Sequence, residues 1–215
     1  MTRPLRRTRV KICGLTRRED VLEAVRLGAD AVGFVFWPRS PRYLDPIHAG
    51  RVIDAVPPLV ARVGVFVDPS PADVAAVRAA TGIGVVQLHG DEQVEDFIHL
   101  GMPVMKAVDV STDHGLAGSI GLAPSVLPLV DAVDPRLRGG TGLRADWSRA
   151  ARLAEVRPCV LAGGLDASNV AEAISAVRPW AIDVSSGVEE APGIKDHDRL
   201  RALFAALDRA AREDV

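Results

Sequence analysis

The chain has 215 residues, of which 48% are hydrophobic and 25% charged, and its formal net charge at pH 7 is −2. This composition is typical of a globular protein, and so small a net charge argues against a strongly basic nucleic-acid-binding surface. No apolar run approaches the roughly 18 residues that cross a bilayer, and no apolar segment follows the basic start as in a secretory signal. We therefore expect a cytoplasmic protein with no nucleic-acid and no membrane partner.

Short runs rich in valine, isoleucine and alanine alternate along the chain with longer segments of helical period. After a basic leader over 1–8, which we expect to be flexible, strands are predicted at 9–13, 31–36, 62–67, 84–88, 103–108, 126–131, 159–162 and 180–184. Helices are predicted from Arg18 to Gly28, Pro46 to Val56, Pro71 to Thr81, Asp91 to Leu100 and Asp196 to about Arg212.

Several predicted strands are apolar throughout, which is expected of a parallel sheet covered on both faces. Eight strands, each followed by a connecting segment, predict a single (β/α)8 TIM barrel as one domain over 1–215. An open doubly wound sheet has the same alternation, and the pattern separates the two folds poorly. The segment 109–125 is rich in glycine, serine and alanine, so we expect a loop or a degenerate short helix after the fifth strand.

The first predicted strand carries Lys11 and Cys13, which share a face because they are two positions apart. Cys13 ends the strand just before a Gly-Leu-Thr turn, where a thiol is well placed to meet a ligand. On this stretch alone, a small buried side chain is the commoner outcome. Cys13 and Cys159 are the only cysteines, which is too few for a disulfide framework and indicates a reducing compartment.

Glycine-rich turns follow the last three predicted strands, at the end of the barrel where function is located in this fold. Their candidate phosphate-binding residues are Gly140, Thr141 and Gly142 after strand six, Gly163 and Gly164 after strand seven, and Ser185, Ser186 and Gly187 after strand eight. Glycines allow main-chain N–H groups to approach an anion closely. One such turn is equally well explained without a ligand, but three turns on one rim favour phosphate binding.

Three polar residues lie at or just after the ends of predicted strands. Arg42 offers a guanidinium fork to a carboxylate, or simply faces solvent. Asp131 ends an apolar strand, where it either acts as an acid or caps the next turn. His89 binds a ligand or ties loops together, and we favour the structural role. The other histidines lack metal-ligand spacing, so no metal site is predicted.

Taken in order, the motifs from about Arg9 to Leu207 resemble the phosphoribosylanthranilate isomerase family of tryptophan biosynthesis. The motifs are Lys11-Ile12-Cys13-Gly14, Gly33-Phe34-Val35-Phe36, Ser40-Pro41-Arg42-Tyr43, Gly64-Val65-Phe66-Val67, Gln87-Leu88-His89-Gly90, Asp131, Gly139-Gly140-Thr141-Gly142, Leu161-Ala162-Gly163-Gly164-Leu165, Asp183-Val184-Ser185-Ser186-Gly187-Val188-Glu189 and Pro192-Gly193-Ile194-Lys195-Asp196. No single motif is decisive, but the ordered set is specific.

The resemblance implies a cofactor-free isomerase that performs an Amadori rearrangement of N-(5-phosphoribosyl)anthranilate. It implies that Cys13 is the general base and Asp131 the general acid. Lys11 is then expected to lower the pKa of the Cys13 thiol, and Arg42 to bind the anthranilate carboxylate. Asp183 is a further candidate, for holding a ribose hydroxyl.

Two other interpretations are open. Another sugar-phosphate barrel of the histidine or tryptophan pathways would use an aspartate, or lysine and glutamates, where this chain has Cys13. A non-catalytic sugar-phosphate-binding barrel is expected to lack Cys13 or Asp131, although an inert relative can retain both. The expected partner is a small-molecule substrate, with no cofactor, and both a monomer and a homodimer are compatible with the sequence.

Overall fold

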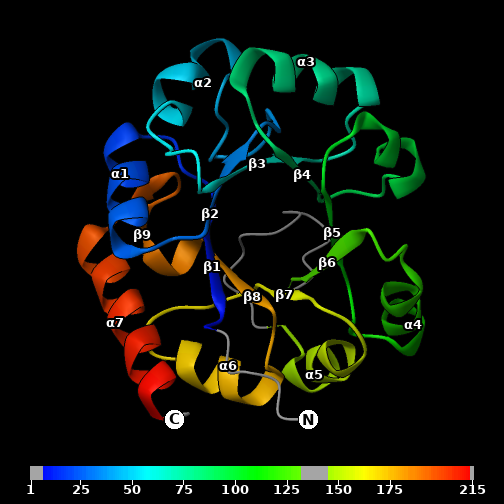
Figure 1. Cartoon of the computed structure of the whole chain (residues 1–215), viewed down its shortest axis with the longest axis vertical. Coiled ribbons are helices and arrows are strands. Elements are labelled where there is room, and N and C mark those ends of the chain that lie inside the picture. The colour runs from blue at the N-terminus through cyan, green and yellow to red at the C-terminus, as the bar shows by residue number, and fades with distance from the viewer. Residues whose placement is uncertain (1–6, 132–144, 214–215) are drawn as a thin grey trace.

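The computed structural model describes residues 7–131 and 145–213, and eight parallel strands within them form a closed barrel (Figure 1). The strands are β1 (Arg9–Ile12), β2 (Ala31–Val35), β3 (Ala61–Phe66), β4 (Val85–Leu88), β5 (Val104–Val108), β6 (Val126–Val130), β7 (Val160–Leu161) and β8 (Ala181–Val184). The first and last residues of each of these strands differ from their predicted positions by no more than one residue. Because β1 pairs with β8, the predicted barrel is confirmed and the open sheet is excluded.

Helices surround the barrel (Figure 1). They are α1 (Arg18–Leu27), α2 (Pro46–Ile53), α3 (Pro71–Thr81), α4 (Asp113–Gly121), α5 (Trp147–Val156), α6 (Val170–Val177) and α7 (His197–Glu213). Side-chain caps define several of their starts: Asp45 accepts a hydrogen bond from the N–H of Ile47 before α2, and Ser70 accepts one from Asp73 before α3. Gly28 ends α1 at a φ of 105°, a conformation that glycine adopts readily.

Two connections test the less regular parts of the prediction. The segment 91–100 forms two 3-10 turns, η1 (Val94–Asp96) and η2 (Ile98–Leu100), so the predicted α-helix there is wrong. Its buried residues Val94 and Phe97 are three positions apart, a spacing that suits three residues per turn. The segment 109–125 contains α4, which begins after the capping Thr112, so a short helix forms there instead of a loop.

Apolar side chains pack in separate layers outside and inside the barrel. The outer layer joins the strands to the helices, whereas the inner one includes Val63, Met105, Leu129, Val160, Ala162 and Ala181 and a smaller cluster of Cys13, Val35 and Val65. Fully burying an aliphatic side chain of this kind stabilises the fold by about 1.5–3 kcal/mol. Buried polar residues, among them Lys11, Gln87 and Asp183, also point into the interior, so apolar side chains are not the only ones that line it.

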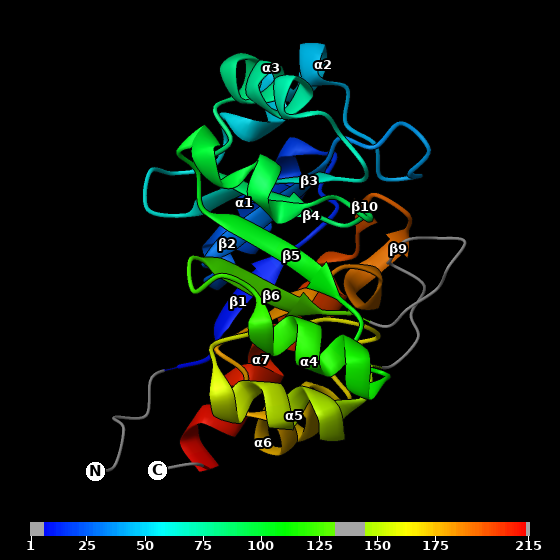
Figure 2. The same cartoon turned by 90° about the vertical axis from the view of Figure 1, so that its right-hand side faces the viewer.

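The chain after β8 forms a short 3-10 turn, η3 (Ser186–Val188), and a hairpin of β9 (Glu189–Ala191) and β10 (Ile194–Lys195). Figure 2 shows the hairpin on the side toward which the arrowheads of β5 and β6 point. At the other end of the chain, Arg7 pairs with Asp30 at 2.8 Å, while 1–6 of the predicted leader lie outside the described residues. Within the described ranges, no helix combines the length and apolarity needed to cross a membrane.

Candidate active site

The first group of polar side chains lies inside the barrel where β1 meets β8. Lys11 Nζ is 2.8 Å from Asp183 Oδ2, and these side chains are 4% and 8% exposed. Cys13 is also buried and interacts with the Lys11 ammonium. Gly33 on β2 leaves space for both side chains, because a Cβ there would lie 2.8 Å from Cys13 Sγ and 3.1 Å from Lys11 Nζ. Lys11 and Cys13 therefore share the inner face, as the strand alternation predicts.

This environment raises the pKa of the Cys13 thiol. Burial is the largest cause, the Lys11 ammonium opposes it without outweighing it, and the Asp183 carboxylate adds to it. Lys11 thus acts to lower the pKa of the thiol, as expected, but burial outweighs it and the net shift is upward. Burial lowers the pKa of Lys11 itself, but Asp183 and Cys13 outweigh burial and raise it, so Lys11 stays charged.

Alkylation of Cys13 by iodoacetamide is expected to accelerate with pH beyond the range of an ordinary thiol. Only the thiolate reacts, and with a pKa above the ordinary value of about 8.5 its fraction grows about tenfold per pH unit through neutral pH. Mass spectrometry of the peptide that contains Cys13 measures this rate. The experiment uses the Cys159→Ser protein, in which Cys13 is the one thiol. Cys159 itself is expected to react slowly, since burial raises its pKa to about 11. A rate that levels off near neutral pH would contradict the raised pKa.

The second group of polar side chains lies at the ends of β4 and β6, across the barrel from β1. His89 Nε2 is 3.3 Å from Asp131 Oδ2, and the side chains are 13% and 14% exposed. Gln87, which is 1% exposed, places its amide nitrogen 3.1 Å from His89 Nδ1. The intervening strand β5 contributes Ala107, which packs against the inner apolar cluster. His89 therefore contacts the candidate acid, a pairing that the strand pattern alone does not predict.

Arg42 lies on the loop between β2 and α2, and its side chain passes over Gly14, the residue after Cys13. A Cβ at Gly14 would lie 2.5 Å from Arg42 Cδ. Arg42 donates from Nε to Glu189 Oε1 at 2.9 Å and from Nη2 to Glu189 Oε2 at 2.7 Å. Its side chain is 12% exposed, which excludes the solvent-facing alternative. Because Glu189 occupies the Nε–Nη2 edge of the guanidinium, the Nη1–Nη2 edge is left for a second carboxylate.

Glu189 and Lys195 are site residues to which the sequence analysis assigns no role. Lys195 Nζ donates to Glu189 Oε1 at 2.8 Å and to the carbonyl oxygen of Ser185 at 3.1 Å. Burial alone would raise the pKa of Glu189, but the hydrogen bond from Arg42 and the charge of Lys195 bring it below its ordinary value. Opposite charges on either side of the Pro192-Gly193 turn are the sequence signal for this pair. The pair ties Arg42 to the hairpin β9–β10.

The glycine-rich turns after β7 and β8 lie against each other. A Cβ at Gly187 would overlap the carbonyl oxygen of Leu165, so only glycine allows this approach. Gly163 and Gly164 have φ angles of 84° and 62°. None of the main-chain hydrogen bonds within the described residues uses their N–H groups. Phosphate binding by these two N–H groups stays a prediction.

The turn after β8 connects this rim to the thiol. Ser185 Oγ donates to the carbonyl oxygen of Cys13 at 3.2 Å, and Ser186 begins η3. The third predicted turn, with Gly140, Thr141 and Gly142, lies outside the described residues. In the order of the strands, the described turns come between β6, which carries the candidate acid, and β1, which carries the thiol.

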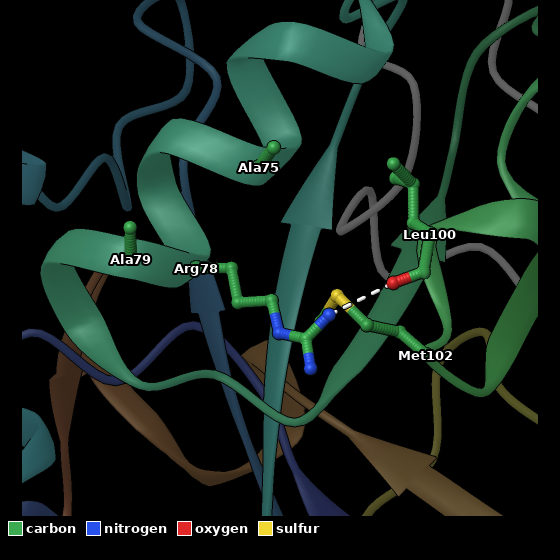
Figure 3. Close-up of a pocket in the computed structure, with 5 residues that line it drawn as sticks. All are labelled: Ala75, Arg78, Ala79, Leu100 and Met102. Atoms are coloured by element: carbon green, nitrogen blue, oxygen red, sulfur yellow. Dashed lines mark hydrogen bonds between the residues drawn. The ribbon is translucent and has the colours of Figure 1, made fainter.

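A separate surface hollow of about 280 Å³ does not belong to this site. It is lined by Ala75, Arg78, Ala79, Leu100 and Met102, from α3 and the segment that leads into β5 (Figure 3). Arg78 Nη1 donates to the carbonyl oxygen of Leu100 at 2.8 Å across it. Because Met102 precedes β5, the hollow lies toward the amino ends of the strands, where (β/α)8 barrels do not carry active sites.

A thiol and a carboxyl group at one mouth of the barrel, with a glycine-rich rim and an arginine beside them, are the arrangement expected of a (β/α)8-barrel enzyme. The family described as N-(5'phosphoribosyl)anthranilate (PRA) isomerase matches residues 10–206. The chain belongs to this family and is an isomerase. The resemblance drawn from the ordered motifs is thus confirmed.

Individual relatives agree over nearly the full length. The N-(5'-phosphoribosyl)anthranilate isomerase of Chromohalobacter salexigens is 48% identical over 209 residues, which cover 96% of this chain and 97% of that protein. A phosphoribosyl anthranilate isomerase in complex with reduced 1-(o-carboxyphenylamino)-1-deoxyribulose 5-phosphate is 41% identical, with a TM-score of 0.83 over 94% of this chain and 99% of that one. Monomers generated from the dimeric Thermotoga maritima isomerase are 40% identical, with a TM-score of 0.83 over the same shares of the two chains.

Proposed function

We propose that the chain converts N-(5-phosphoribosyl)anthranilate to 1-(2-carboxyphenylamino)-1-deoxyribulose 5-phosphate, an Amadori rearrangement in cytoplasmic tryptophan biosynthesis. The observation that carries the proposal is the position of Cys13 and Asp131 directly after β1 and β6, with the glycine-rich turns after β7 and β8 between them in strand order. The rearrangement needs a proton donor and a proton acceptor on either side of a sugar whose ends are anchored. Arg42, beside Cys13, supplies the anchor for the anthranilate carboxylate.

In the first step Asp131 donates its proton to the ring oxygen of the aminoribofuranose. The bond between that oxygen and C1 breaks, the oxygen becomes a hydroxyl group, and the nitrogen lone pair forms a C1=N iminium ion. Asp131 is left as a carboxylate. His89 Nε2, 3.3 Å from Asp131 Oδ2, is placed to stabilise the negative charge that develops there.

In the second step the Cys13 thiolate removes the proton from C2 of the sugar. The electrons of that C–H bond form a C1=C2 double bond, the nitrogen becomes neutral, and the resulting enolamine tautomerises to the ketone. Burial raises the pKa of the Cys13 thiol in the free protein, so the base needs a positive charge beside it. Lys11 supplies one permanently, and the iminium ion supplies another only after the ring has opened. Because the iminium ion forms only when the ring opens, proton donation by Asp131 precedes proton removal by Cys13.

The activity is tested directly with purified protein. Addition of the protein to phosphoribosylanthranilate is expected to remove its anthranilate-type fluorescence as the substrate is consumed. In cells, the chain is expected to restore growth to a tryptophan auxotroph that lacks the isomerase. A folded sample that binds a phosphorylated product analogue but does not turn over substrate would overturn the proposal.

Replacement of Arg42 by lysine is expected to raise KM by about tenfold to a hundredfold, with kcat nearly unchanged. Lysine keeps a positive charge beside Glu189 but lacks the planar fork, and a hydrogen bond to a charged group is worth about 1.5–3 kcal/mol. Steady-state kinetics measure both constants. Arg39→Lys, the same change at an exposed position of the same loop, is the matched control. A loss confined to kcat would show that Arg42 does not bind the substrate carboxylate.

A further inference from the structure

Glu189 is the buried acid of the hairpin β9–β10, and its carboxylate is surrounded by hydrogen-bond donors. Oε1 accepts from Arg42 Nε at 2.9 Å, from Lys195 Nζ at 2.8 Å and from the N–H of Gly193 at 3.1 Å, while Oε2 accepts from Arg42 Nη2 at 2.7 Å. The side chain is only 4% exposed. Even when fully hydrogen-bonded, a buried ion pair is often no more stable than apolar residues of similar volume. Stability alone is therefore a weak reason for a glutamate at this position.

Arg42 is the donor that anchoring of the hairpin does not explain. The other donors belong to the same hairpin as Glu189, whereas Arg42 comes from the loop between β2 and α2, 147 positions away. The hairpin has anchors of its own, because Lys195 Nζ donates to the carbonyl oxygen of Ser185 at 3.1 Å and the N–H of Lys195 donates to Asp20 Oδ2 at 3.0 Å. The contact between Glu189 and Arg42 thus concerns the arginine more than the hairpin.

The same hairpin is fixed to the segment that follows Cys13. Thr16 donates from Oγ1 to the carbonyl oxygen of Gly193, and Arg17 donates from Nη2 to the carbonyl oxygen of Lys195 at 3.1 Å. These hydrogen bonds join the turn after β1 to both sides of the hairpin turn. The carboxylate that the hairpin carries therefore has a fixed position relative to Cys13.

Arg42 is held at two points along its side chain. Its stem passes over Gly14, where a Cβ would lie 2.5 Å from Arg42 Cδ, and its guanidinium lies on Glu189. Its side-chain hydrogen bonds to residues that the structure describes use only Nε and Nη2. An arginine that is already ordered loses little conformational entropy when a ligand binds to its remaining edge.

We propose that Glu189 is a positioning residue for the substrate: it holds the guanidinium of Arg42 so that the Nη1–Nη2 edge meets the carboxylate of the bound ligand. This inference rests on the proposed function, in which Arg42 binds the anthranilate carboxylate. Glu189 acts only through Arg42. Its own charge would repel a substrate carboxylate, and Lys195, 2.8 Å away, offsets that charge.

The fixed guanidinium is measured without substrate, in the ligand-free protein labelled with ¹⁵N at arginine. Separate ¹H–¹⁵N signals for Nη1 and Nη2 appear only when rotation of the guanidinium is slow, and an Arg42→Lys variant identifies the Arg42 signals. The wild-type protein is expected to show separate signals for Arg42, and Glu189→Asp is expected to merge them. A freely rotating Arg42 in the wild-type protein would overturn the proposal.

Glu189→Asp also provides the binding experiment. Aspartate keeps the negative charge between Arg42 and Lys195, but it is one methylene group shorter and cannot hold both at hydrogen-bond distance. Calorimetry compares two probes: the reduced product, which carries the carboxylate, and the same compound with an unsubstituted phenyl ring. The first is expected to bind about threefold to tenfold more weakly to the variant, the effect of ordering one long side chain on binding, and the second to stay within about twofold.

Turnover gives an independent measure of the same effect. Glu189→Asp is expected to raise KM by about threefold to tenfold with kcat nearly unchanged, because the acid and the base are intact. Glu190→Asp, the same change at the exposed neighbouring position of β9, is the matched control and is expected to leave both probes and both kinetic constants unchanged.

The outcomes separate this inference from the proposed function. If the wild-type protein neither turns over phosphoribosylanthranilate nor binds the reduced product, the function is wrong, whereas the arginine spectra still decide whether Glu189 holds Arg42. If the wild-type protein is active and Glu189→Asp weakens both probes equally, or neither, Glu189 has a purely structural role and the inference is wrong.

Glu189→Gln decides the question if the aspartate variant does not fold. Glutamine removes both the bidentate contact with Arg42 and one negative charge, and these changes act on binding in opposite directions. Loss of positioning lowers the preference for the probe with the carboxylate, whereas loss of the charge raises it. A lower preference supports the proposal, and a preference that is unchanged or higher overturns it.

Discussion

Replacement of Cys13 by serine is expected to lower kcat by about a hundredfold to ten thousandfold, the range by which a positioned base contributes. The serine hydroxyl occupies nearly the same space beside Lys11 and Gly33, but it does not ionise in the pH range where a thiol does. Steady-state turnover of phosphoribosylanthranilate measures the loss. The dissociation constant of a reduced product analogue is expected to stay within a few-fold, because the phosphate and carboxylate contacts are intact.

Cys159→Ser is the matched control for this experiment. Cys159 is fully buried directly before β7, where it packs in the layer between strands and helices. Its replacement is expected to leave kcat unchanged and to lower the melting temperature, since a hydroxyl group is then buried among apolar side chains. If Cys13→Ser keeps kcat within tenfold of the wild type, another group removes the C2 proton.

Replacement of Asp131 by asparagine is expected to lower kcat by a similar factor, about a hundredfold to ten thousandfold. The amide has the shape of the carboxyl group and its oxygen can still face His89, but it has no acidic proton to give to the ring oxygen. The substrate then has to open without an acid, so the loss appears in kcat and KM changes little. Rapid mixing with fluorescence detection measures a single turnover and assigns the loss to the chemical step.

Asp109→Asn makes the same chemical change after the neighbouring strand β5. Asp109 is exposed, and its carboxylate accepts hydrogen bonds from the N–H and the hydroxyl group of Ser111, at 2.7 and 2.9 Å. An asparagine oxygen can accept at least one of these bonds, so this variant is expected to retain full activity. An Asp131→Asn enzyme as active as the Asp109→Asn enzyme would remove Asp131 from the mechanism.

The barrel is predictable from the sequence because buried parallel strands are short, continuous apolar runs, and their bounds are correct to within one residue. The structure of the connection over 91–100 is not predictable, because apolar residues three positions apart fit both an α-helix and a 3-10 turn. The local hydrogen bonds decide between the two, and the pattern of apolar residues does not contain them. The element that differs is therefore a connection and not a strand of the barrel.

The candidate site is predictable as far as position along a strand determines it. Any residue directly after a barrel strand reaches the same mouth, so Cys13, Asp131 and the rim glycines can be named in advance. The hydrogen-bond partners of these side chains cannot be named in advance. Arg42 and Glu189, for example, are 147 positions apart, and only the closed barrel brings them together. The direction of the Cys13 pKa shift is likewise decided by depth of burial, which competes with Lys11 and which the sequence does not quantify.

The pairing of Lys11 with Asp183 joins residues that are 172 positions apart, at the seam between the first strand and the last. A chain that has collapsed but has not yet added β8 lacks this contact, and water then reaches β1. Such long-range closures form slowly, because most of the chain must be ordered first. In a refolding experiment, the burial that raises the pKa of Cys13 is thus completed together with the last strand pairing. The alkylation rate of Cys13 is therefore expected to report closure of the barrel separately from the earlier formation of its helices.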